Sequence, residues 1–254
     1  GEYDKAIAYY EKALNILLKA FGEYHPNVAT DYNNLGSAWR EKGEYDKAIA
    51  YYEKALNIDL KVFGNDHPNV ATDYSSLGAG WYSKGEYDKA IAYFERALNI
   101  WIKVFGNEHP NVATIYNNLG EAWRAKGEYK KAIAYYKKAL KIDLKVFGNE
   151  HPNVATIYNN LGLAWHSKGE YDKAIAYYKK ALKIDLKVFG NEHLKVATRY
   201  NNLGSAWYSK GDYDKAIEYF EKSLKIFNKF LGPNHPNTKN VERYIQSVKN
   251  KMKK

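Results

Sequence analysis

Apolar and small residues recur at helical spacing along the chain, in two alternating kinds of stretch. In the first kind they fall at i, i+3, i+4 and i+7, which is one face of a helix. Between positions 26 and 42 these residues are Tyr32, Leu35, Gly36 and Trp39. Pro26 suits the first turn of such a helix, and Gly43 marks its end because glycine takes a left-handed turn readily. We predict a helix of about 17 residues, roughly 25 Å long.

The second kind of stretch carries a longer apolar stripe. Its members are Tyr45, Ala48, Ile49, Tyr52, Ala55, Leu56 and Phe63, and Gly64 and Asn65 follow them. This predicts a second helix of about 20 residues, roughly 30 Å long, that runs antiparallel to the first. Small residues such as Gly36 and Ala48 let the two helices approach closely, and large ones such as Tyr52 fill the gaps between them.

This pair of stretches recurs every 42 residues. The recurrence is marked by Gly1, Gly43, Gly85, Gly127, Gly169 and Gly211, each of which opens nearly the same ten residues. The stretch Lys103–Gly120 is repeated letter for letter as Lys145–Gly162. A fixed period of this length indicates a solenoid, in which each unit buries its apolar face only against its neighbours. We therefore predict an all-α fold and a binding or scaffolding role.

The predicted array is one solenoid over residues 1–254. It divides into a half repeat at 1–22, helix pairs at 23–64, 65–106, 107–148, 149–190 and 191–232, and a C-terminal capping helix at 233–254. The last helix shows one apolar stripe (Val241, Tyr244, Ile245 and Val248) on an otherwise polar surface, as a cap requires. No such cap covers the first helix, where the flank of Ala6, Tyr10 and Ala13 is expected to lie open. We expect end-to-end self-association there.

The spacing from Ala29 to Leu56, A-x2-Y-x2-L-G-x2-W-x3-G-x-Y-x2-A-I-x2-Y-x2-A-L, resembles the tetratricopeptide repeat. The usual repeat has 34 residues. The longer form here, with its F-G-N-x-H-P-N-V-A linker, is similar to the repeats of kinesin light chains. The resemblance implies a right-handed superhelix of antiparallel helix pairs that binds a protein or an extended peptide on its concave face and has no catalytic activity.

Composition narrows the possible chemistry. The chain has no cysteine, which excludes disulfides, thiol catalysis and cysteine-ligated zinc. No run is long or apolar enough for membrane insertion, and a cytoplasmic location is the default expectation. His25, His67, His109, His151, His193 and His235 recur once per unit beside the linker. Units about 20 Å apart keep these histidines from sharing a metal, so we predict a role in the turn. We expect no enzyme activity, cofactor or metal.

Paired asparagines are the leading candidates for ligand binding. By 100° steps they lie on the face of each first helix that points away from its partner. An asparagine offers both donors and an acceptor, so it can hold the backbone of an extended peptide whatever its side chains. The resemblance implicates Asn34, Asn118, Asn160 and Asn202, with Asn33, Asn117, Asn159 and Asn201 beside them. The alternative is that these amides bridge neighbouring helices and hold the stack together.

Other residues on or near this face have two interpretations each. Arg40 and Arg124 can pair with carboxylates of a peptide, or with Glu41 and Glu121 in the same hollow. Tyr82, His166 and Tyr208 can offer stacking surface, or are solvated aromatics of a tyrosine-rich chain. Trp101 stands where other repeats have Leu17, Asp59, Asp143, Asp185 and Phe227, and is either a binding hot spot or packing under the linker.

Charge supports an alternative role. The formal net charge is +10, and an outward stripe turns basic toward the C-terminus. It comprises Lys130, Lys137, Lys141, Lys179 and Lys183. Such a stripe can bind polyanions, but no aromatic platform or nucleic-acid signature accompanies it, and no nucleic acid partner is expected. Polyanion binding and a purely structural or self-assembling rod remain the two alternatives to a peptide-binding scaffold.

Overall fold

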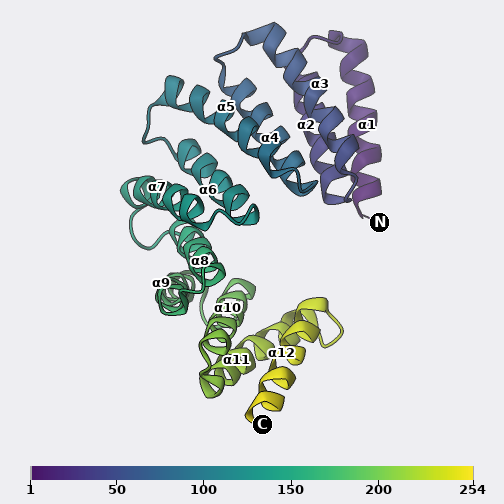
Figure 1. The fold of residues 1–254 in the computed structure, drawn as a ribbon. Coiled ribbons are helices and arrows are strands. Elements are labelled where there is room, and N and C mark those ends of the chain that lie inside the picture. The colour runs from purple at the N-terminus through teal and green to yellow at the C-terminus, as the bar shows by residue number, and fades with distance from the viewer. Residues whose placement is uncertain (1, 254) are drawn as a thin grey trace. The chain divides into compact units, whose positions relative to one another are not determined.

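The computed structural model describes residues 2–253, and within this range the chain forms twelve helices and no strand (Figure 1). The helices are α1 (Glu2–Phe21), α2 (Pro26–Glu41), α3 (Tyr45–Phe63), α4 (Pro68–Ser83), α5 (Tyr87–Phe105), α6 (Pro110–Ala125), α7 (Tyr129–Phe147), α8 (Pro152–Ser167), α9 (Tyr171–Phe189), α10 (Leu194–Lys210), α11 (Tyr213–Leu231) and α12 (Pro236–Met252). The predicted all-α fold and the alternation of a shorter with a longer helix are confirmed. None of these helices has the length and apolarity that crossing a membrane would need.

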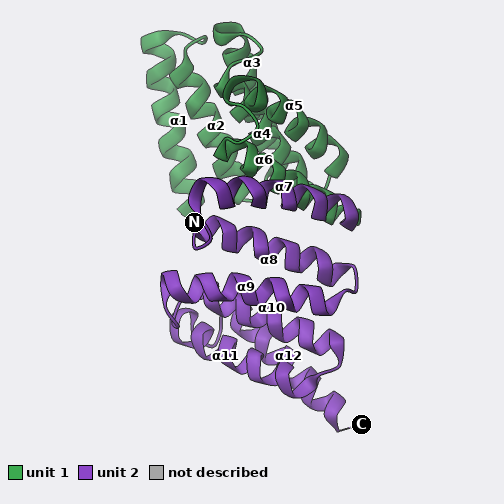
Figure 2. Ribbon diagram, turned by 90° about the vertical axis from the view of Figure 1, so that its left-hand side faces the viewer, with its two compact units in different colours: residues 1–128 green, residues 129–254 purple. Residues whose placement is uncertain are grey.

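The chain divides into two compact units, residues 1–128 and 129–254 (Figure 2). In each unit, every helix packs against the next one along the chain, so the fold is a series of antiparallel helix pairs. Even-numbered helices also contact one another, α2 with α4, α4 with α6, and α8 with α10. Successive odd-numbered helices of the same unit make no comparable contact among the described residues. The even-numbered helices therefore form the inner layer of each unit.

A glycine lies against an aromatic ring inside the helix pairs. A Cβ atom on Gly36 of α2 would fall 2.5 Å from Cε1 of Tyr52 of α3. Gly78 meets Phe94 and Gly204 meets Phe220 in the same way. The rings are almost fully buried, and Ala48 and Ala55 on α3 are buried as well. The predicted packing of small against large residues is confirmed, since only glycine leaves room for the ring at these points.

Histidines begin the even-numbered helices. His25 is the N-cap of α2, and its Nδ1 atom accepts a hydrogen bond of 3.2 Å from the backbone N–H of Asn27. The imidazole ring also stacks on Phe21 at the end of α1, with 4.4 Å between ring centroids. The same cap is formed by His67, His109, His151, His193 and His235. The turn role predicted for these residues is confirmed, because each satisfies a backbone donor that the helix leaves free.

The outermost helices differ from the inner ones in burial. On α12, Val241, Ile245 and Val248 are buried as predicted. Tyr244 of the same predicted stripe is 47% exposed, since its ring covers Phe220 from the edge of the core at a centroid distance of 5.4 Å. On α1, the flank of Ala6, Tyr10 and Ala13 is only half-buried, whereas the equivalent residues of α3 are fully buried.

Candidate functional site

A hollow of about 260 Å³ opens between α2 and α4 on the inner layer of residues 1–128. Its lining residues are Thr30, Asn33, Asn34, Asp59, Asn69, Thr72, Asp73 and Ser76. Thr30 and Thr72 are exposed, whereas Asp59 and Asp73 are only 4% and 1% exposed. The hollow therefore has a hydroxyl and amide rim above a buried acidic floor. We call the two positions held by Asp59 and Asp73, and their equivalents in other repeats, the floor pair.

An equivalent hollow of about 160 Å³ lies between α10 and α12, four repeats further along the chain. It is lined by Thr198, Asn201, Phe227, Asn237, Asn240, Val241 and Tyr244, and all seven positions correspond to positions of the first hollow. The rim again carries a threonine and amides. The floor pair, however, is Phe227 and Val241, so the floor is apolar where that of the first hollow is acidic.

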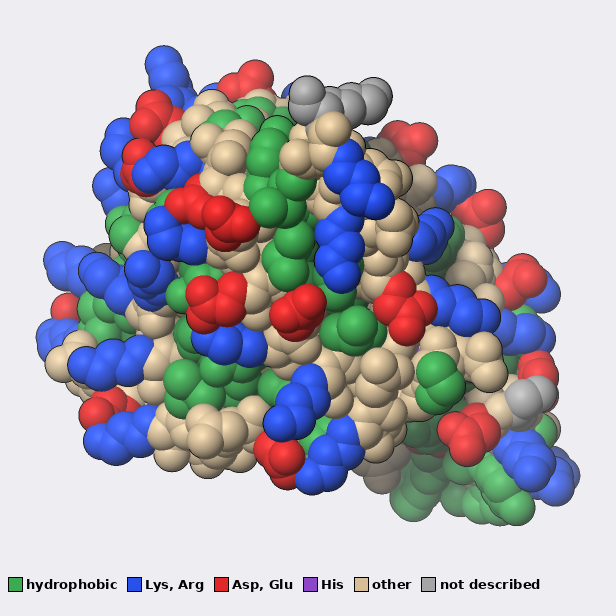
Figure 3. Space-filling view, turned by 90° about the horizontal axis from the view of Figure 1, so that it is seen from below, with side chains coloured by type: hydrophobic (Ala, Val, Ile, Leu, Met, Phe, Trp, Pro, Cys, Tyr) green, Lys and Arg blue, Asp and Glu red, His purple; other side chains and the backbone are tan. Residues whose placement is uncertain are grey.

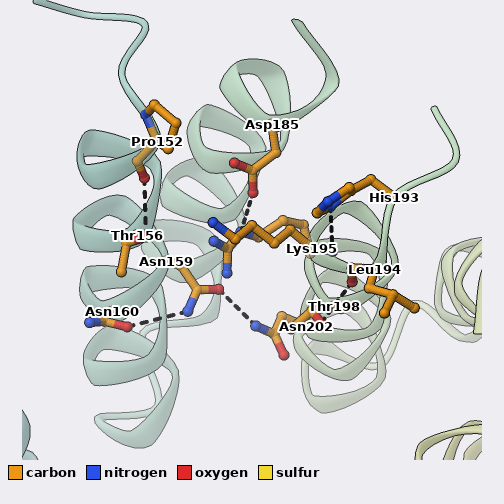
Figure 4. Close-up of polar contacts among 11 residues, drawn as sticks. Pro152, Thr156, Asn159, Asn160, Asp185, His193, Leu194, Lys195, Thr198 and Asn202 are labelled. Atoms are coloured by element: carbon orange, nitrogen blue, oxygen red, sulfur yellow. Dashed lines mark hydrogen bonds and ion pairs between the residues drawn. The ribbon is translucent and has the colours of Figure 1, made fainter. Parts of the chain in front are cut away.

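Between α8 and α10 the asparagines contact one another. Asn202 Nδ2 donates to Asn159 Oδ1 at 2.8 Å, and Asn159 Nδ2 donates to Asn160 Oδ1 at 3.3 Å (Figure 4). Asn159 and Asn160 are buried, and Asn202 is partly exposed. The bridging interpretation describes this stretch, because the amides of α8 and α10 satisfy one another across the two helices.

The floor pair between α9 and α10 is a buried ion pair. Arg199 Nε donates to Asp185 Oδ2 at 2.8 Å, and both side chains are buried (Figure 4). The floor pair thus differs in chemistry from repeat to repeat. It is Leu17 with Asp31, Asp59 with Asp73, Trp101 with Ile115, Asp143 with Ile157, Asp185 with Arg199, and Phe227 with Val241. The sequence showed that the first residue of the floor pair varies between repeats, but the second residue was missed. That residue could have been found because it also varies between repeats and always lies 14 positions after the first.

Predicted candidates in unit 1 have partners within the chain. Asn33 Nδ2 donates a short hydrogen bond to Asp73 Oδ1, which ties α2 to α4. Arg40 pairs with Glu41 at 2.9 Å, as the ion-pair interpretation predicts. Asn34, Asn117, Asn118 and Arg124 are half-buried on the inner layer. Asn201 in unit 2 is half-buried at the second hollow.

Aromatic candidates take mainly packing roles. Trp101 is buried and lies nearly parallel to the ring of His109, 5.9 Å away, so the packing interpretation is confirmed. Tyr82 packs on Tyr87 and Tyr208 on Tyr213, each at 5.7 Å. His166 is half-buried with its Nε2 atom 3.1 Å from Ser209 Oγ, and burial lowers the pKa of its imidazole.

Burial shifts the pKa of the acidic floor residues upward. It raises the pKa of Asp73 to about 8, and the neighbouring Asp59 carboxyl adds to this, against the hydrogen bond from Asn33. Burial also raises the pKa of Asp59. The pKa of Asp143 rises to about 6, again by burial, because no cation of its own floor pair faces it. At neutral pH, the Asp59–Asp73 pair therefore holds a proton.

We expect the free energy of unfolding to fall as pH rises from 5 to 8. A carboxyl whose pKa is raised on folding binds its proton more tightly in the folded state, so deprotonation above the unfolded pKa favours unfolding. Asp143 contributes to this fall between its ordinary pKa of 3.8 and about 6, and Asp73 contributes between 3.8 and about 8. Urea unfolding across this range measures the slope. Asp143→Asn should make the slope shallower below pH 6 and leave it unchanged above pH 7, and an unchanged slope below pH 6 in that variant would contradict the assignment.

The predicted basic stripe on α7 and α9 is exposed at all five lysines, Lys130, Lys137, Lys141, Lys179 and Lys183. On the face of the molecule drawn in Figure 3, acidic side chains lie among the basic ones, and hydrophobic side chains show between them. Within residues 2–253, no three His, Asp or Glu side chains are grouped so that they could hold a metal ion.

Comparison with known families assigns the fold. A tetratricopeptide repeat model matches residues 1–61, 38–83, 81–145, 123–187, 153–229 and 196–245. The chain belongs to the tetratricopeptide repeat family, and it is an all-α repeat scaffold of the kind that serves protein interaction. Proteins of this family are generally non-catalytic, and the family implies protein partners.

Solved structures support this assignment. BtubC (BKLC) from P. vanneervenii is 25% identical over 93% of this chain and 94% of that one, with a TM-score of 0.77. A putative kinesin light chain from Podosopora anserina, with nearly identical TPR-like repeats, shares the fold at 22% identity, covering 81% and 97% of the chains with a TM-score of 0.69. MamA is 28% identical over 82% and 96%, with a TM-score of 0.52. No curated protein matches the chain.

Proposed function

We propose that the inner layer of each unit binds an extended protein segment. The observation that supports this most is the recurring hollow between successive even-numbered helices. Its rim keeps one threonine and two asparagines at equivalent positions in both places, while its floor pair changes from acidic to apolar. A constant rim suits the repeating backbone of a peptide, and a varying floor suits its varying side chains.

Asparagines at the rim are proposed to hold the peptide backbone. Asn34, Asn118 and Asn202 keep part of their surface exposed and can offer donor and acceptor groups to a ligand. Asn160 is buried, and Asn159 is occupied by Asn202, so these two are proposed to orient their neighbours. Arg40 and Arg124 flank the same layer. Cysteine is absent, and we propose that the scaffold works in the cytoplasm.

The change Asn118→Ala is expected to weaken peptide binding about tenfold, because lost hydrogen bonds to a peptide group cost on the order of 1–3 kcal/mol. The ligand is a peptide selected from a random library displayed against this chain, with affinity measured by fluorescence polarisation. The control is Asn99→Ala on α5, an exposed asparagine outside the inner layer. Equal affinity of the two variants would reject the site, provided that circular dichroism shows the same helicity.

A second candidate is self-association through α1, for which the burial pattern is specific evidence. Ile16 is 66% exposed, whereas the equivalent Ile58 of α3 is 2% exposed because it packs back onto the preceding helix pair. A second copy presents the same exposed face of α1, so two such faces can cover one another. Sedimentation of residues 1–254 should show a mass that grows with concentration, and Ile16→Lys should abolish that growth. A monomer at all concentrations would exclude this function.

A further inference from the structure

The acidic floor between α2 and α4 is incompletely satisfied by the chain. Asp59 and Asp73 are both more than nine-tenths buried, and both line the hollow. The side-chain amide of Asn33 donates a hydrogen bond to one carboxyl oxygen of Asp73. Asp59 hydrogen-bonds with Asn69 and with Asp73 itself. Asp59 Oδ1 and Asp73 Oδ2, however, receive no hydrogen bond from an N–H group of residues 2–253. Buried carboxyl oxygens without a donor are costly, so a floor of this kind favours a ligand that supplies positive charge and N–H donors.

The same floor pair in another repeat holds a cation supplied by the chain itself. Asp185 is equivalent to Asp59, and Arg199 is equivalent to Asp73. There the guanidinium Nε lies 2.8 Å from the carboxylate, buried between α9 and α10. The backbone geometry of this repeat therefore accommodates a cationic group at the floor pair. In the α2–α4 hollow, Asp73 occupies the position that Arg199 has in the other repeat. This floor pair therefore has two carboxyl groups and no cation from the chain.

We propose that the hollow between α2 and α4 binds the ammonium or guanidinium group of a lysine or arginine side chain from a bound protein segment. This inference rests on the proposed peptide-binding function and names the side chain that the first hollow selects. The cation would sit between the two carboxyls of the floor. Hydroxyls of Thr30 and Thr72 and the amide of Asn69 stand at the rim. The apolar stem of a lysine or arginine would extend outward past this rim.

Charge at the site supports a cation over an anion or a neutral group. The groups that face the pair are the amide of Asn33 from α2, the amide of Asn69 from α4 and the imidazole of His67 from the preceding turn. Because Asn33 and Asn69 are neutral amides, these groups do not supply two positive charges to balance two carboxylates. A bound ammonium would replace the proton that the carboxyl pair holds and release it to solvent, so binding should strengthen as pH rises from 6 to 8.

The test uses small cations that need no peptide. n-Butylammonium and N-butylguanidinium chlorides are titrated separately into ¹⁵N-labelled protein, with sodium chloride at equal ionic strength as the blank. Both side-chain amides at the site, of Asn33 and Asn69, are expected to shift, and the two titrations tell whether an ammonium or a guanidinium is preferred. The hollow between α10 and α12, with its Phe227–Val241 floor, is the internal control, and its Asn237 amide should not respond.

Two substitutions of Asp73 test whether the cations bind at the floor pair. Asp73→Ile recreates the Asp143–Ile157 floor pair, which the fold already contains, and is expected to weaken cation binding at least about tenfold. Asp73→Arg recreates the Asp185–Arg199 pair and should abolish binding by filling the site from within. Shifts that persist in both variants, or no shift in the wild type, would overturn the proposal. Tighter binding of Ca²⁺ than of either organic cation would overturn it as well.

Peptide selection separates this inference from the proposed function. Sequences selected against the wild type are expected to carry lysine or arginine at one fixed position, and this enrichment should disappear with Asp73→Ile. Selected peptides without such enrichment would reject the cationic side chain while leaving the peptide-binding function intact. Failure to select any peptide, together with specific amide shifts by the small cations, would reject the function and retain the site.

Discussion

Replacing Arg199 by methionine should destabilise unit 2 by about 3–5 kcal/mol, the usual cost of leaving one partner of a buried ion pair alone. Asp185 is fully buried, and its ion pair with Arg199 joins α9 to α10. Methionine keeps much of the arginine's volume but offers no donor. The carboxylate of Asp185 would then be buried without a charged partner, which is the source of the loss. Urea unfolding and hydrogen exchange of α9 and α10 measure it.

A double variant tests whether the cost comes from the lone charge. Asp185→Phe with Arg199→Val copies the floor pair of Phe227 and Val241, which the same fold already packs. Replacing both partners of a buried ion pair by apolar groups is often neutral or stabilising. The double variant is therefore expected to regain most of the stability lost in Arg199→Met. If Arg199→Met alone were as stable as the wild type at pH 8, the ion pair would have no structural role.

Two glycines of α4 are expected to respond to alanine with opposite signs. A Cβ atom on Gly78 would lie 2.6 Å from Cδ1 of Phe94, whose ring is buried and cannot move aside. Gly78→Ala should cost about 1–3 kcal/mol through overpacking, which exceeds the gain of about 0.5–1 kcal/mol that alanine brings to a helix. Thermal unfolding followed by circular dichroism measures the change.

Gly80→Ala is the matched control, two residues further along the same helix. Its new Cβ atom would lie 3.1 Å from Cγ1 of Ile49, and the equivalent positions of the other repeats already hold alanine, namely Ala38, Ala122, Ala164 and Ala206. We expect a gain of up to about 1 kcal/mol. Losses of equal size at the two positions would show that helix flexibility, and not the close approach of Phe94, explains the glycine at 78.

Most of the fold was predictable because its determinants are local. Pro26 and Gly43 mark the ends of α2 through the backbone geometry that each residue permits. The stripe of Tyr32, Leu35 and Gly36 defines the buried face through the helical period alone. The histidines were recognised as turn residues from their regular spacing. Their capping bonds confirm this, because a cap joins residues only two positions apart.

The candidate site was predictable only in part. The position of the asparagines on the inner layer follows from helical geometry. Their partners do not, since Asn33 meets Asp73 and Asn202 meets Asn159 across about one repeat of sequence. Whether such an amide binds a ligand or a neighbour depends on which side chains reach it. Tyr244 illustrates the same limit, because it belongs to the apolar stripe of α12 but lies at the edge of the core.

The sequence by itself determined the twelve helices of residues 2–253, their caps and their order, since helical period, proline, glycine and the 42-residue repeat act over short stretches of chain. Only the tertiary structure decided which buried polar groups meet. It places Asp59 beside Asp73 in one repeat and Asp185 beside Arg199 in another. Hydrogen bonds and buried charges act over a few ångströms, so their consequences depend on the packing of neighbouring helices and not on the pattern within one helix.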